Sequence, residues 1–501
     1  MKPTLEQQAI IHAAEAGESL SVIARAGCGK TASLRMVADA IPTRSALLLT
    51  FNRSAADDAR LRLRGRMWVD VRTAHSLAWG ALGSQYGDRV TTNPWAVRAW
   101  ILETFGRELA SFERQDGDRE RAASVVLDGL GHFCHSADDV PVQSHLPKDF
   151  LRTMGREAGA TAAMVDLVRR AWIRIADLQS SAPVTHDVYL KQFSLCCPRL
   201  GFESIWMDES QDADPAMLRI VLEQDHAQRI LVGDPSQSIY GFRDAVDAMD
   251  VAPFRRVPLT MCWRFGEEIA KAANFVLAAM GQEHLIQGRG PVGDVVPYSD
   301  DVPTMVLARS NAGVVEEALD LLDRDAKMAI LGGAEAVVQA VRAAFDLYCG
   351  ERTTHPIFRF FKTFEELEEA AESDQGGILK TYVRLVLKYR TGIPLVCDRL
   401  LRESVIEKRA DVVVGTVHSA KGRESDHVRL AADFPAFCAP KGERGELQLD
   451  MEEARVAYVA LTRAIRLLEI GAYAQALQSS LRCARLLAQG IRFDQEFPVA
   501  S

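Results

Sequence analysis

The chain has 501 residues, of which 48% are hydrophobic and 25% are charged, and its formal net charge is −9. Because a single hydrophobic core stops growing near ~250–300 residues, this globular composition implies several domains. The acidic balance excludes a histone-like or tail-driven binder of polyanions. Any nucleic-acid site must therefore be a local basic and aromatic channel.

The sequence also bounds the compartment. No stretch approaches the ~18 consecutive apolar residues that a membrane helix needs, so we expect no membrane contact. The first residues, MKPTLEQQAI, lack the charged and then apolar segments of a secretion signal. The nine cysteines include no C-x-x-C pair, which argues against a disulfide framework. We therefore expect a soluble protein in a reducing, cytoplasmic environment.

Strands and helices alternate at the start of the chain. Short apolar runs at 19–24, 45–50 and 69–73 are typical of strands, and 30–40 and 54–63 have helical spacing. This alternation predicts a parallel sheet covered by helices. Residues 95–109, 119–132, 148–157 and 161–178 instead have apolar positions at i, i+3 and i+4, which indicates a helical insertion.

Strand patterns return at 204–207 and 229–232, where we expect them to complete the first sheet. A second α/β section begins near Val257, with strands expected at 304–308, 412–416, 428–431 and 467–470. The predicted fold class is α/β, with two parallel-sheet domains that each carry a helical insertion. The expected boundaries are 1–90 and 180–255 for the first domain, 91–179 for its insertion, 256–345 and 409–501 for the second domain, and 346–408 for its reduced insertion.

A glycine-rich turn follows the first predicted strand. Residues 24–31 (ARAGCGKT) match the pattern G-x-x-x-x-G-K-[ST], except that alanine replaces the first glycine. Backbone N–H groups of such a loop surround phosphate oxygens, and the following helix N-terminus adds positive potential. The alternative is a glycine-rich turn that precedes Lys-Thr by chance. We expect ATP to be held by Gly27, Cys28, Gly29, Lys30 and Thr31, with Thr31 also a ligand of Mg²⁺.

Two carboxylates end the strand expected at 204–207. Asp208 would ligate Mg²⁺, and Glu209 would orient or deprotonate the attacking water. A lone Asp-Glu pair is usually surface charge, but this pair ends an apolar strand and precedes Ser-Gln-Asp212. Together with the loop, these carboxylates predict ATP hydrolysis.

Four longer motifs resemble those of the UvrD/Rep-type superfamily-one DNA helicases, in that family's order. They are DESQD at 208–212, GDPSQSIYGFR at 233–243, TVHSAKGRE at 416–424 and YVALTRA at 458–464. The segment THDVYLK at 185–191 and the short C-terminal half look most similar to the F-box DNA helicase branch, here expected without the F-box. The resemblance implies two RecA-like motor domains that use ATP to move along DNA.

The resemblance assigns residues to the nucleoside part of ATP. Gln7 would bind the adenine edge, with Gln8 as the alternative. Trp263 would stack on the adenine, which suits an indole face. Glu424 would bind the ribose hydroxyl.

It also assigns residues to the γ-phosphate. Gln237 would sense this phosphate, and Arg264 and Arg463 would reach it from the second motor domain. Guanidinium groups suit the charge of a transferring phosphoryl group. For each arginine the alternative is a surface ion pair.

The resemblance further implies a track for single-stranded DNA. Bases stack on aromatic side chains and phosphates meet polar ones, so binding should not depend on sequence. For Tyr240 and Phe242, the alternative is that the aromatic side chains pack in the core. The expected track consists of Phe51, Asn52, Arg53, Thr73, His75, Tyr240, Phe242, Arg309, Asn311, Thr416 and His418.

Two other clusters are interpreted as structural. His132, Cys134 and His135, with His145 further on, do not have the spacing of a zinc site. The acidic run at 365–372 is typical of a solvated helix face.

The predicted function is an ATP-dependent DNA translocase or helicase that moves 3′→5′ on single-stranded DNA and opens a duplex with a 3′ overhang. The polarity comes from the resemblance alone. The alternative is a DNA-activated ATPase subunit of a repair or phage-defence complex that signals to a partner nuclease. It arises because the interruption at 346–408 is much shorter than in larger UvrD-like enzymes. A third hypothesis is an RNA motor of the same superfamily. ATP and Mg²⁺ are the expected cofactors.

Overall fold

A computed structural model describes residues 2–42, 44–112, 118–152, 159–239, 248–299, 301–359, 361–372, 377–441, 446–471 and 473–488. The chain divides into two compact units. The first consists of Met1–Ala24 and Gly29–Leu259, and the second of Arg25–Cys28 and Thr260–Ser501. Each unit contains a six-stranded sheet.

The sheet of the first unit is entirely parallel, in the order β3-β2-β4-β5-β1-β6. Its inner strands β1 and β2 are largely apolar runs that are buried along their whole length, as expected for a parallel sheet covered on both faces. The strands are β1 (Leu20–Ala24), β2 (Ala46–Thr50), β3 (Val69–Thr73), β4 (Ser204–Asp208), β5 (Gln228–Gly233) and β6 (Arg255–Leu259).

Several helices of this unit begin at a polar N-cap residue that ends a strand or follows one. Asn52, Thr73 and Asp214 each accept a hydrogen bond from a backbone N–H of the first turn that follows. Such caps satisfy the free donors at a helix start and fix where the helix begins. The helices beside the sheet are α1 (Leu5–Glu15), α2 (Lys30–Ala40), α3 (Arg53–Arg62), α4 (Ala74–Ala81), α11 (Pro215–Leu222) and α12 (Ala248–Val251).

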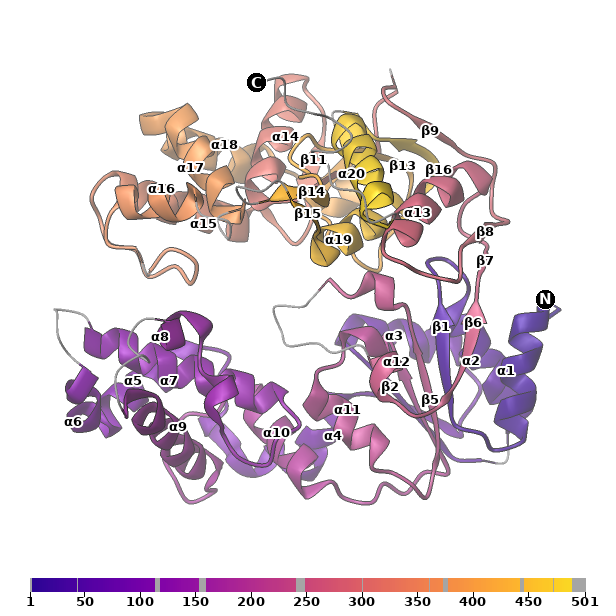
Figure 1. Cartoon of the computed structure of the whole chain (residues 1–501), viewed down its shortest axis with the longest axis horizontal. Coiled ribbons are helices and arrows are strands. Elements are labelled where there is room, and N and C mark those ends of the chain that lie inside the picture. Colours follow the sequence, from indigo (N-terminus) through magenta and orange to yellow (C-terminus); the bar gives the residue numbers. More distant parts are fainter. Residues whose placement is uncertain are drawn as a thin grey trace. The chain divides into compact units, whose positions relative to one another are not determined.

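A group of helices lies on one side of this sheet, with α4 and α10 (His186–Cys196) between the group and the strands (Figure 1). Phe105 and Ile101 belong to the same buried cluster as Leu47 and Ile205 of the strands. The insertion therefore shares a continuous hydrophobic core with the sheet. Its helices are α5 (Pro94–Thr104), α6 (Gly106–Leu109), α7 (Asp118–His135), α8 (Lys148–Arg152) and α9 (Ala160–Ala176).

The second unit has a parallel sheet in the order β11-β12-β10-β13-β16-β9. Two short pairs accompany it, β7 (Met261–Cys262) with β8 (Gln287–Gly288) and β14 (Cys438–Lys441) with β15 (Glu446–Leu449). The sheet strands are β9 (Asp294–Val296), β10 (Met305–Ala308), β11 (Met328–Ile330), β12 (Val412–Thr416), β13 (Ser425–Leu430) and β16 (Ala464–Glu469).

The helices of the second unit include a separate helical group that extends from its sheet. Tyr382 and Phe358 of this group pack in one cluster with Val306 and Val414 of the strands. The group comprises α15 (Ala334–Tyr348), α16 (Phe364–Glu372), α17 (Gly377–Tyr389) and α18 (Ile393–Glu403). The others are α13 (Glu267–Ala279), α14 (Asn311–Asp323), α19 (Met451–Leu461) and α20 (Tyr473–Ala488).

The predicted α/β fold class is confirmed, with two parallel sheets that each have a helical insertion. Several strands of the two sheets were not expected, namely β6, β9 and β11, and β6 also changes a boundary. The sequence interpretation began the second section near Val257, whereas β6 pairs with β1 and extends the first unit to Leu259. The strand contains Pro258, which is tolerated because β6 lies at the edge of the sheet.

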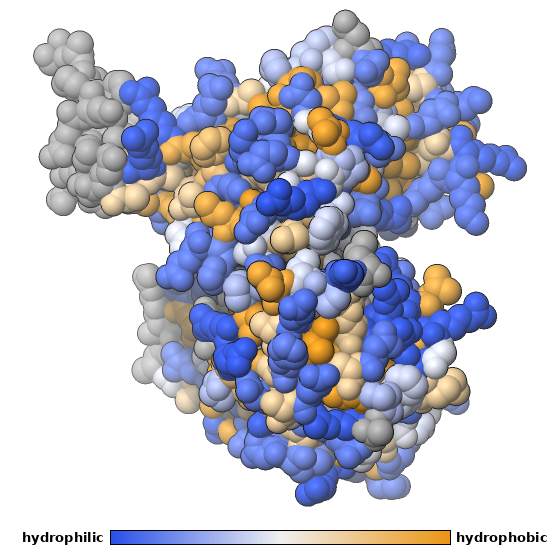
Figure 2. Space-filling view, turned by 90° about the vertical axis from the view of Figure 1, so that its right-hand side faces the viewer, coloured by the Kyte–Doolittle hydropathy of each residue, from blue (hydrophilic) through white to orange (hydrophobic). Residues whose placement is uncertain are grey.

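Hydrophilic side chains predominate on the face shown in Figure 2, and hydrophobic ones gather there in small patches. Such scattered exposure is normal for a globular protein. Among the described residues, no helix combines the length and the apolar character that crossing a membrane requires.

Candidate functional site

The loop between β1 and α2 is shaped by two glycines in the left-handed region. Gly27 has φ 71° and Gly29, which precedes α2, has φ 81°. A Cβ atom on Gly27 would lie 2.6 Å from Cβ of Arg264 and 2.7 Å from Sγ of Cys262. Only glycine fits there, because any side chain would clash and the backbone is already strained for other residues. The sequence thus sets the curled loop that a phosphate cradle needs.

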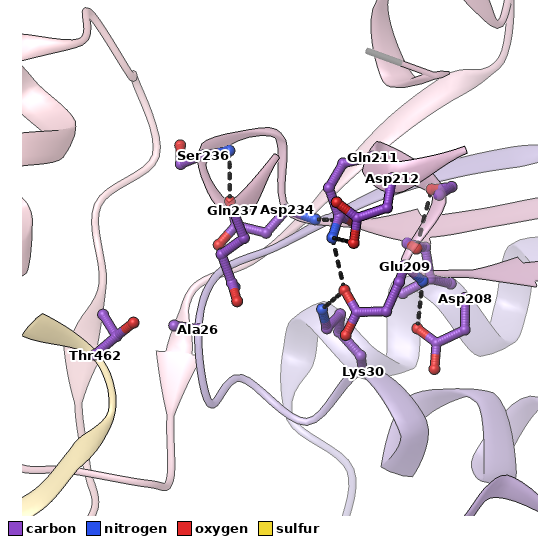
Figure 3. A network of polar contacts seen from close by, with 12 residues as sticks. Ala26, Lys30, Asp208, Glu209, Gln211, Asp212, Asp234, Ser236, Gln237 and Thr462 are labelled. Carbon is purple, nitrogen blue, oxygen red and sulfur yellow. Dashed lines mark hydrogen bonds and ion pairs between the residues drawn. The ribbon is translucent and has the colours of Figure 1, made fainter. Parts of the chain in front are cut away.

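Lys30 begins α2 and points toward the end of β4 (Figure 3). Its Nζ lies 2.5 Å from Oε2 of Glu209, and the two side chains are 14% and 31% exposed. Burial opposes the charge on Lys30, but the carboxylates of Glu209 and Asp208 outweigh it and raise the pKa of Lys30 above its usual value. The lysine is therefore a permanent cation at the loop.

Asp208 ends β4, and its Oδ1 accepts a hydrogen bond from the N–H of Glu209 at 2.9 Å. Burial, followed by repulsion from Glu209, raises the pKa of Asp208 to about 6, while Lys30 acts in the opposite direction. A second cation would stabilise this carboxylate. Carboxylate and hydroxyl oxygens are the hard donors that Mg²⁺ prefers, so Asp208 and Thr31, in the first turn of α2, fit this ion.

Glu209 has an unusual backbone, with φ 52° and ψ 39°. A left-handed conformation is uncommon for a residue other than glycine, and such strain gathers at functional sites. Gln211 holds the side chain, because its Nε2 donates to Oε2 of Glu209 at 2.7 Å while its Oε1 accepts from the N–H of Asp234 at 3.0 Å. The sequence analysis gave Gln211 no role, although it lies within the DESQD motif.

Gln237 follows β5 and is also fixed by Asp234. Its Nε2 donates to Oδ2 of Asp234 at 2.7 Å, and Oδ1 of the same carboxylate accepts from the N–H of Ser236 at 3.1 Å (Figure 3). Asp234 is fully buried. This aspartate was not singled out from the sequence, but it connects Gln237 to Gln211 and so to Glu209.

The order of the strands explains why these residues meet. The strands β4, β5 and β1 are neighbours in the first sheet, and in parallel strands the carboxyl ends share one edge. Asp208 and Glu209 come from β4, Gln237 from the loop after β5, and Lys30 from the helix after β1. Open α/β sheets bind ligands at this edge.

Gln7 lies beside the same loop. It is 5% exposed, its Nε2 donates to Oγ of Ser33 at 3.2 Å, and that nitrogen is 3.7 Å from the position of a Cβ on Gly29. Its Oε1 also accepts from the N–H of Thr4 at the start of α1. Gln8 is exposed and donates to the carbonyl of Pro3 at 3.4 Å. Of the two glutamines, Gln7 is the one held against the loop.

In the second unit, the predicted nucleotide residues lie close to one another. Trp263 is 45% exposed, and its N–H donates to the carbonyl of Gly27 at 3.0 Å. Arg264 forms an ion pair with Glu424 and donates from Nη1 to the carbonyl of Thr462 at 3.0 Å. The structure thus brings together Arg264 and Glu424, which the resemblance assigns to different parts of ATP.

Arg463 is 2% exposed and precedes β16. Its guanidinium donates to the carbonyls of Val459 at 2.9 Å and Arg423 at 3.2 Å. Tyr458, on α19, which ends two residues before Arg463, is fully buried, and its hydroxyl accepts from the N–H of Ala26 at 3.1 Å. The sequence analysis quoted Tyr458 within a motif but assigned it no role.

The predicted DNA residues of the first unit follow β2 and β3. These strands are paired, with Thr50 opposite Thr73, so residues 51–53 and His75 lie at the same edge. Asn52 and Thr73 are occupied as helix caps of α3 and α4. Arg53 is exposed in the first turn of α3.

Phe51 links this region to the carboxylates. It is half-buried and lines a small pocket together with Thr50, Asp208, Glu209 and Met217. The pocket lies where β2 and β4 end side by side. An aromatic side chain of the expected DNA track is therefore a neighbour of the expected catalytic pair.

His75 is part of a second polar cluster. Its Nε2 lies 3.3 Å from Oδ1 of Asp187, and Nε2 of His135 lies 3.8 Å from the same oxygen. Burial opposes the charge on Asp187, but hydrogen bonds from His135 and His75 outweigh it and hold the pKa of Asp187 well below its usual range. The cluster connects α4 with α7 and α10. Asp187, within THDVYLK, was not assigned a role from the sequence.

The predicted DNA residues of the second unit follow β10 and β12. Arg309 forms a two-pronged ion pair with Glu453, with N···O distances of 2.7 and 2.8 Å. Asn311 begins α14, directly after Ser310, which caps that helix. Thr416 ends β12, and His418 lies in the turn after it. Tyr240 and Phe242 lie outside the described residues.

The histidine-rich segment is engaged in protein contacts. Nδ1 of His132 lies 2.7 Å from the carbonyl oxygen of His145, and Nε2 of His145 lies 3.0 Å from Oδ2 of Asp138. Within the described part of the chain, no group of three or more His, Cys, Asp and Glu side chains is arranged to hold a metal ion.

Comparison with known proteins places these features in a family. The family described as "AAA domain" matches residues 7–243, and that described as "UvrD-like helicase C-terminal domain" matches residues 354–475. The chain is 31% identical over 503 residues to F-box DNA helicase 1 of Gallus gallus. The aligned region covers 93% of this chain and 48% of that relative. It is 28% identical over 501 residues to F-box DNA helicase protein 1 of Schizosaccharomyces pombe, and that alignment covers 92% of this chain and 56% of the relative.

The chain thus spans about half the length of the curated relatives it matches. Among solved structures, arterivirus nonstructural protein 10 (helicase) in complex with DNA is 12% identical, with a TM-score of 0.32 over 95% of this chain and 65% of the other. The PRRSV helicase is 11% identical, with a TM-score of 0.33 over 94% and 56%. These scores are too low to carry an argument. On the sequence matches, the chain belongs to the UvrD-like superfamily-one helicases and is related to their F-box DNA helicase branch, as the motifs predicted.

Proposed function

We propose that this protein is an ATP-dependent DNA helicase that translocates 3′→5′ on single-stranded DNA. The observation that carries the proposal is the connected polar network at the carboxyl edge of the first sheet. There Lys30, Glu209 and Gln211 are joined through Asp234 to Gln237. A structural ion pair alone does not need a strained Glu209 and a chain of buried amides around it.

The loop and the start of α2 would bind the phosphates of ATP. Lys30 would exchange its contact with Glu209 for the β and γ phosphates. Mg²⁺, held by Thr31 and Asp208, would offset the phosphate charge. The exchange releases the Glu209 carboxylate, which Gln211 keeps in place to orient the attacking water. In this scheme, binding of ATP separates Glu209 from Lys30 and so makes the Glu209 carboxylate available as the general base.

The second unit would supply positive charge to the γ-phosphate. Arg264 and Arg463 fit this role because a guanidinium fork matches phosphate oxygens. Arg264 would leave its ion pair with Glu424, which is then free for the ribose hydroxyl. Trp263, which is 45% exposed, offers a face for the adenine.

DNA would lie along the ends of β2 and β3 in the first unit and of β10 and β12 in the second. His75 and Arg53 would contact DNA phosphates. Phe51, which lies beside Asp208 and Glu209, would couple the nucleotide state of the site to binding of the DNA strand. The expected contacts at Tyr240, Phe242, Asn311, Thr416 and His418 belong to the same proposal. The names of the curated relatives, both F-box DNA helicases, support DNA as the substrate.

The test measures ATP hydrolysis and strand displacement on a duplex with a 3′ single-stranded overhang. Duplexes with a 5′ overhang, RNA of the same sequence and a Lys30→Ala protein serve as controls. The proposal requires DNA-stimulated hydrolysis and opening of the 3′-tailed duplex alone. Opening of the 5′-tailed duplex would contradict the polarity, and preference for RNA would favour an RNA motor.

A second candidate is a DNA-activated ATPase subunit that signals to a partner nuclease. The small helical group α16–α18 favours it, because little chain is left there to contact a duplex. DNA-stimulated hydrolysis with no strand displacement would support this candidate over the helicase.

A further inference from the structure

Two cysteines meet at the loop between β1 and α2. Cys28 is a residue of the loop, and Cys262 ends β7. Both side chains are buried, at 2% and 0% exposure, and neither forms a disulfide in this structure. They belong to the same compact unit, which includes Arg25–Cys28.

Their proximity rests on contacts of the main chain as well as of the sulfur atoms. The N–H of Trp263 donates to the carbonyl of Gly27 at 3.0 Å, which aligns the two segments. Sγ of Cys262 lies 2.7 Å from the position where Gly27 would carry a Cβ. The thiol of Cys28 lies near enough to Cys262 to lower the pKa of Cys262 through a hydrogen bond, and its Sγ also lies 3.6 Å from the carbonyl oxygen of Ala26.

We propose that Cys28 and Cys262 are a peroxide-sensitive thiol pair whose disulfide inactivates the nucleotide-binding loop. Formation of the disulfide depends only on the two thiols, while its effect on hydrolysis rests on the proposed function. The oxidant is a hydroperoxide, a small neutral molecule, and the two cysteines that it must reach are 2% and 0% exposed.

The surroundings favour Cys262 as the attacking sulfur. The hydrogen bond from Cys28 lowers the pKa of Cys262, and N–H groups of Phe265 and Arg264 act in the same direction against burial. A thiolate is the nucleophile in such chemistry. Burial instead raises the pKa of Cys438 to about 11 and that of its neighbour Cys483. That second pair is therefore an internal comparison for the same oxidant.

The chemistry balances in two steps. The thiolate of Cys262 attacks one oxygen of hydrogen peroxide, the O–O bond breaks, and the departing hydroxide takes the released proton to form water. This leaves a sulfenic acid on Cys262. The thiol of Cys28 then attacks that sulfur, the S–O bond breaks, and a second water leaves with the thiol proton. Overall, two thiols and one peroxide give one disulfide and two waters.

The disulfide would distort the loop that holds phosphate. An S–S bond of about 2.05 Å is much shorter than the contact between two hydrogen-bonded sulfur atoms. Closing it pulls on the backbone at Cys28, which directly precedes Gly29 and Lys30. A displacement of about 1 Å at reacting groups can cost about 10²-fold in rate. We therefore expect at least a tenfold loss of ATP hydrolysis in the oxidised protein.

The experiment treats the reduced full-length chain with hydrogen peroxide, blocks free thiols with iodoacetamide and digests with trypsin. Mass spectrometry should find the peptide of residues 26–30 linked to that of residues 257–264, each with one cysteine. The link should appear before one between residues 430–441 and 483–485, which contain Cys438 and Cys483. Loss of hydrolysis should follow the linked fraction, and dithiothreitol should restore it.

Variants separate the pair from other oxidation. Cys262→Ser keeps the size of the side chain, so its protein should hydrolyse ATP normally and resist peroxide. Cys349→Ser, which removes an exposed thiol, should behave as the wild type in both assays. Absence of the linked peptide, or equal sensitivity of Cys262→Ser and wild type, would overturn the proposal. A linked peptide in a protein without ATPase activity would uphold the thiol pair and overturn its effect on hydrolysis together with the proposed function.

Discussion

The ammonium group of Lys30 and the carboxylate of Glu209 are ion-paired, 2.5 Å apart. The residue that we assign to the phosphates of ATP and the residue that we assign to the attacking water are thus each other's partner. Two partly buried groups of opposite charge lower each other's desolvation cost, so removal of either leaves an uncompensated charge. This pairing gives the site a resting arrangement that ATP must displace.

Replacement of Glu209 by Gln should separate binding from hydrolysis. The amide keeps the shape and the contact with Gln211 but cannot accept a proton, so we expect kcat to fall by about 10²–10⁴-fold. Affinity for ATP should stay the same or rise, because Lys30 is released from its partner. Turnover and fluorescent-nucleotide binding measure the two effects. Glu223→Gln, at an exposed i,i+4 ion pair with Arg219, is the matched control and should change neither.

Gln211 should act through Glu209. Truncation by Gln211→Ala removes the hydrogen bond of 2.7 Å to Glu209, and we expect kcat to fall about tenfold, corresponding to about 1.4 kcal/mol. The KM for ATP should change little, since Gln211 is not placed at the phosphates. A variant that raised KM alone, with kcat intact, would contradict the positioning role.

Asp187 should influence DNA binding through His75. The variant Asp187→Asn loses the charge that holds His75 and His135, so we expect affinity for single-stranded DNA to fall several-fold. Binding of ATP should be unchanged, because the cluster lies at β3 rather than at β1. Fluorescence anisotropy with a labelled oligonucleotide measures the affinity for single-stranded DNA. An equal loss of affinity for DNA and for ATP would contradict this role and indicate general misfolding instead.

Asp214 should make stability depend on pH. Burial raises the pKa of Asp214 to about 6, against a hydrogen bond from the N–H of Met217. Because the pKa of Asp214 is higher in the folded than in the unfolded protein, the protonated side chain stabilises the fold. This contribution to the free energy of unfolding is complete below the unfolded pKa of about 4. That contribution is lost as pH rises through about 6.

The variant Asp214→Asn keeps a good N-cap and removes this titration. Relative to the wild type, it should gain about 1–3 kcal/mol between pH 4 and pH 7.5. Thermal or urea unfolding at the two pH values measures the difference. A constant difference between the two proteins would show that Asp214 titrates normally.

Much of the fold was predictable because its strands are short apolar runs followed by polar turns. The run SALLLT gave β2, and the turn ARAGCGKT gave the loop before α2. The edge strand β6 was not predicted; it contains Pro258, which a strand tolerates only at an edge position. Edge positions follow from pairing between distant segments, which a local pattern does not contain.

The site was predictable in its residue types and less so in its contacts. Lys30, Asp208 and Glu209 follow from motif spacing, but Asp234 and Asp187 do not, because their roles come from contacts with partners distant in sequence. Arg309 shows the converse. An arginine expected on DNA is engaged by Glu453, which lies 144 positions away in the chain.

The most direct test of the account is the rate of ATP hydrolysis with and without single-stranded DNA, for the wild type and for Lys30→Ala. We expect DNA to stimulate the wild type and the variant to lose at least about 10²-fold while its circular dichroism spectrum is retained. A wild-type rate of ATP hydrolysis that does not change when DNA is added would contradict the claim of a DNA-dependent ATPase. A Lys30→Ala protein that hydrolyses ATP as fast as the wild type would contradict it as well.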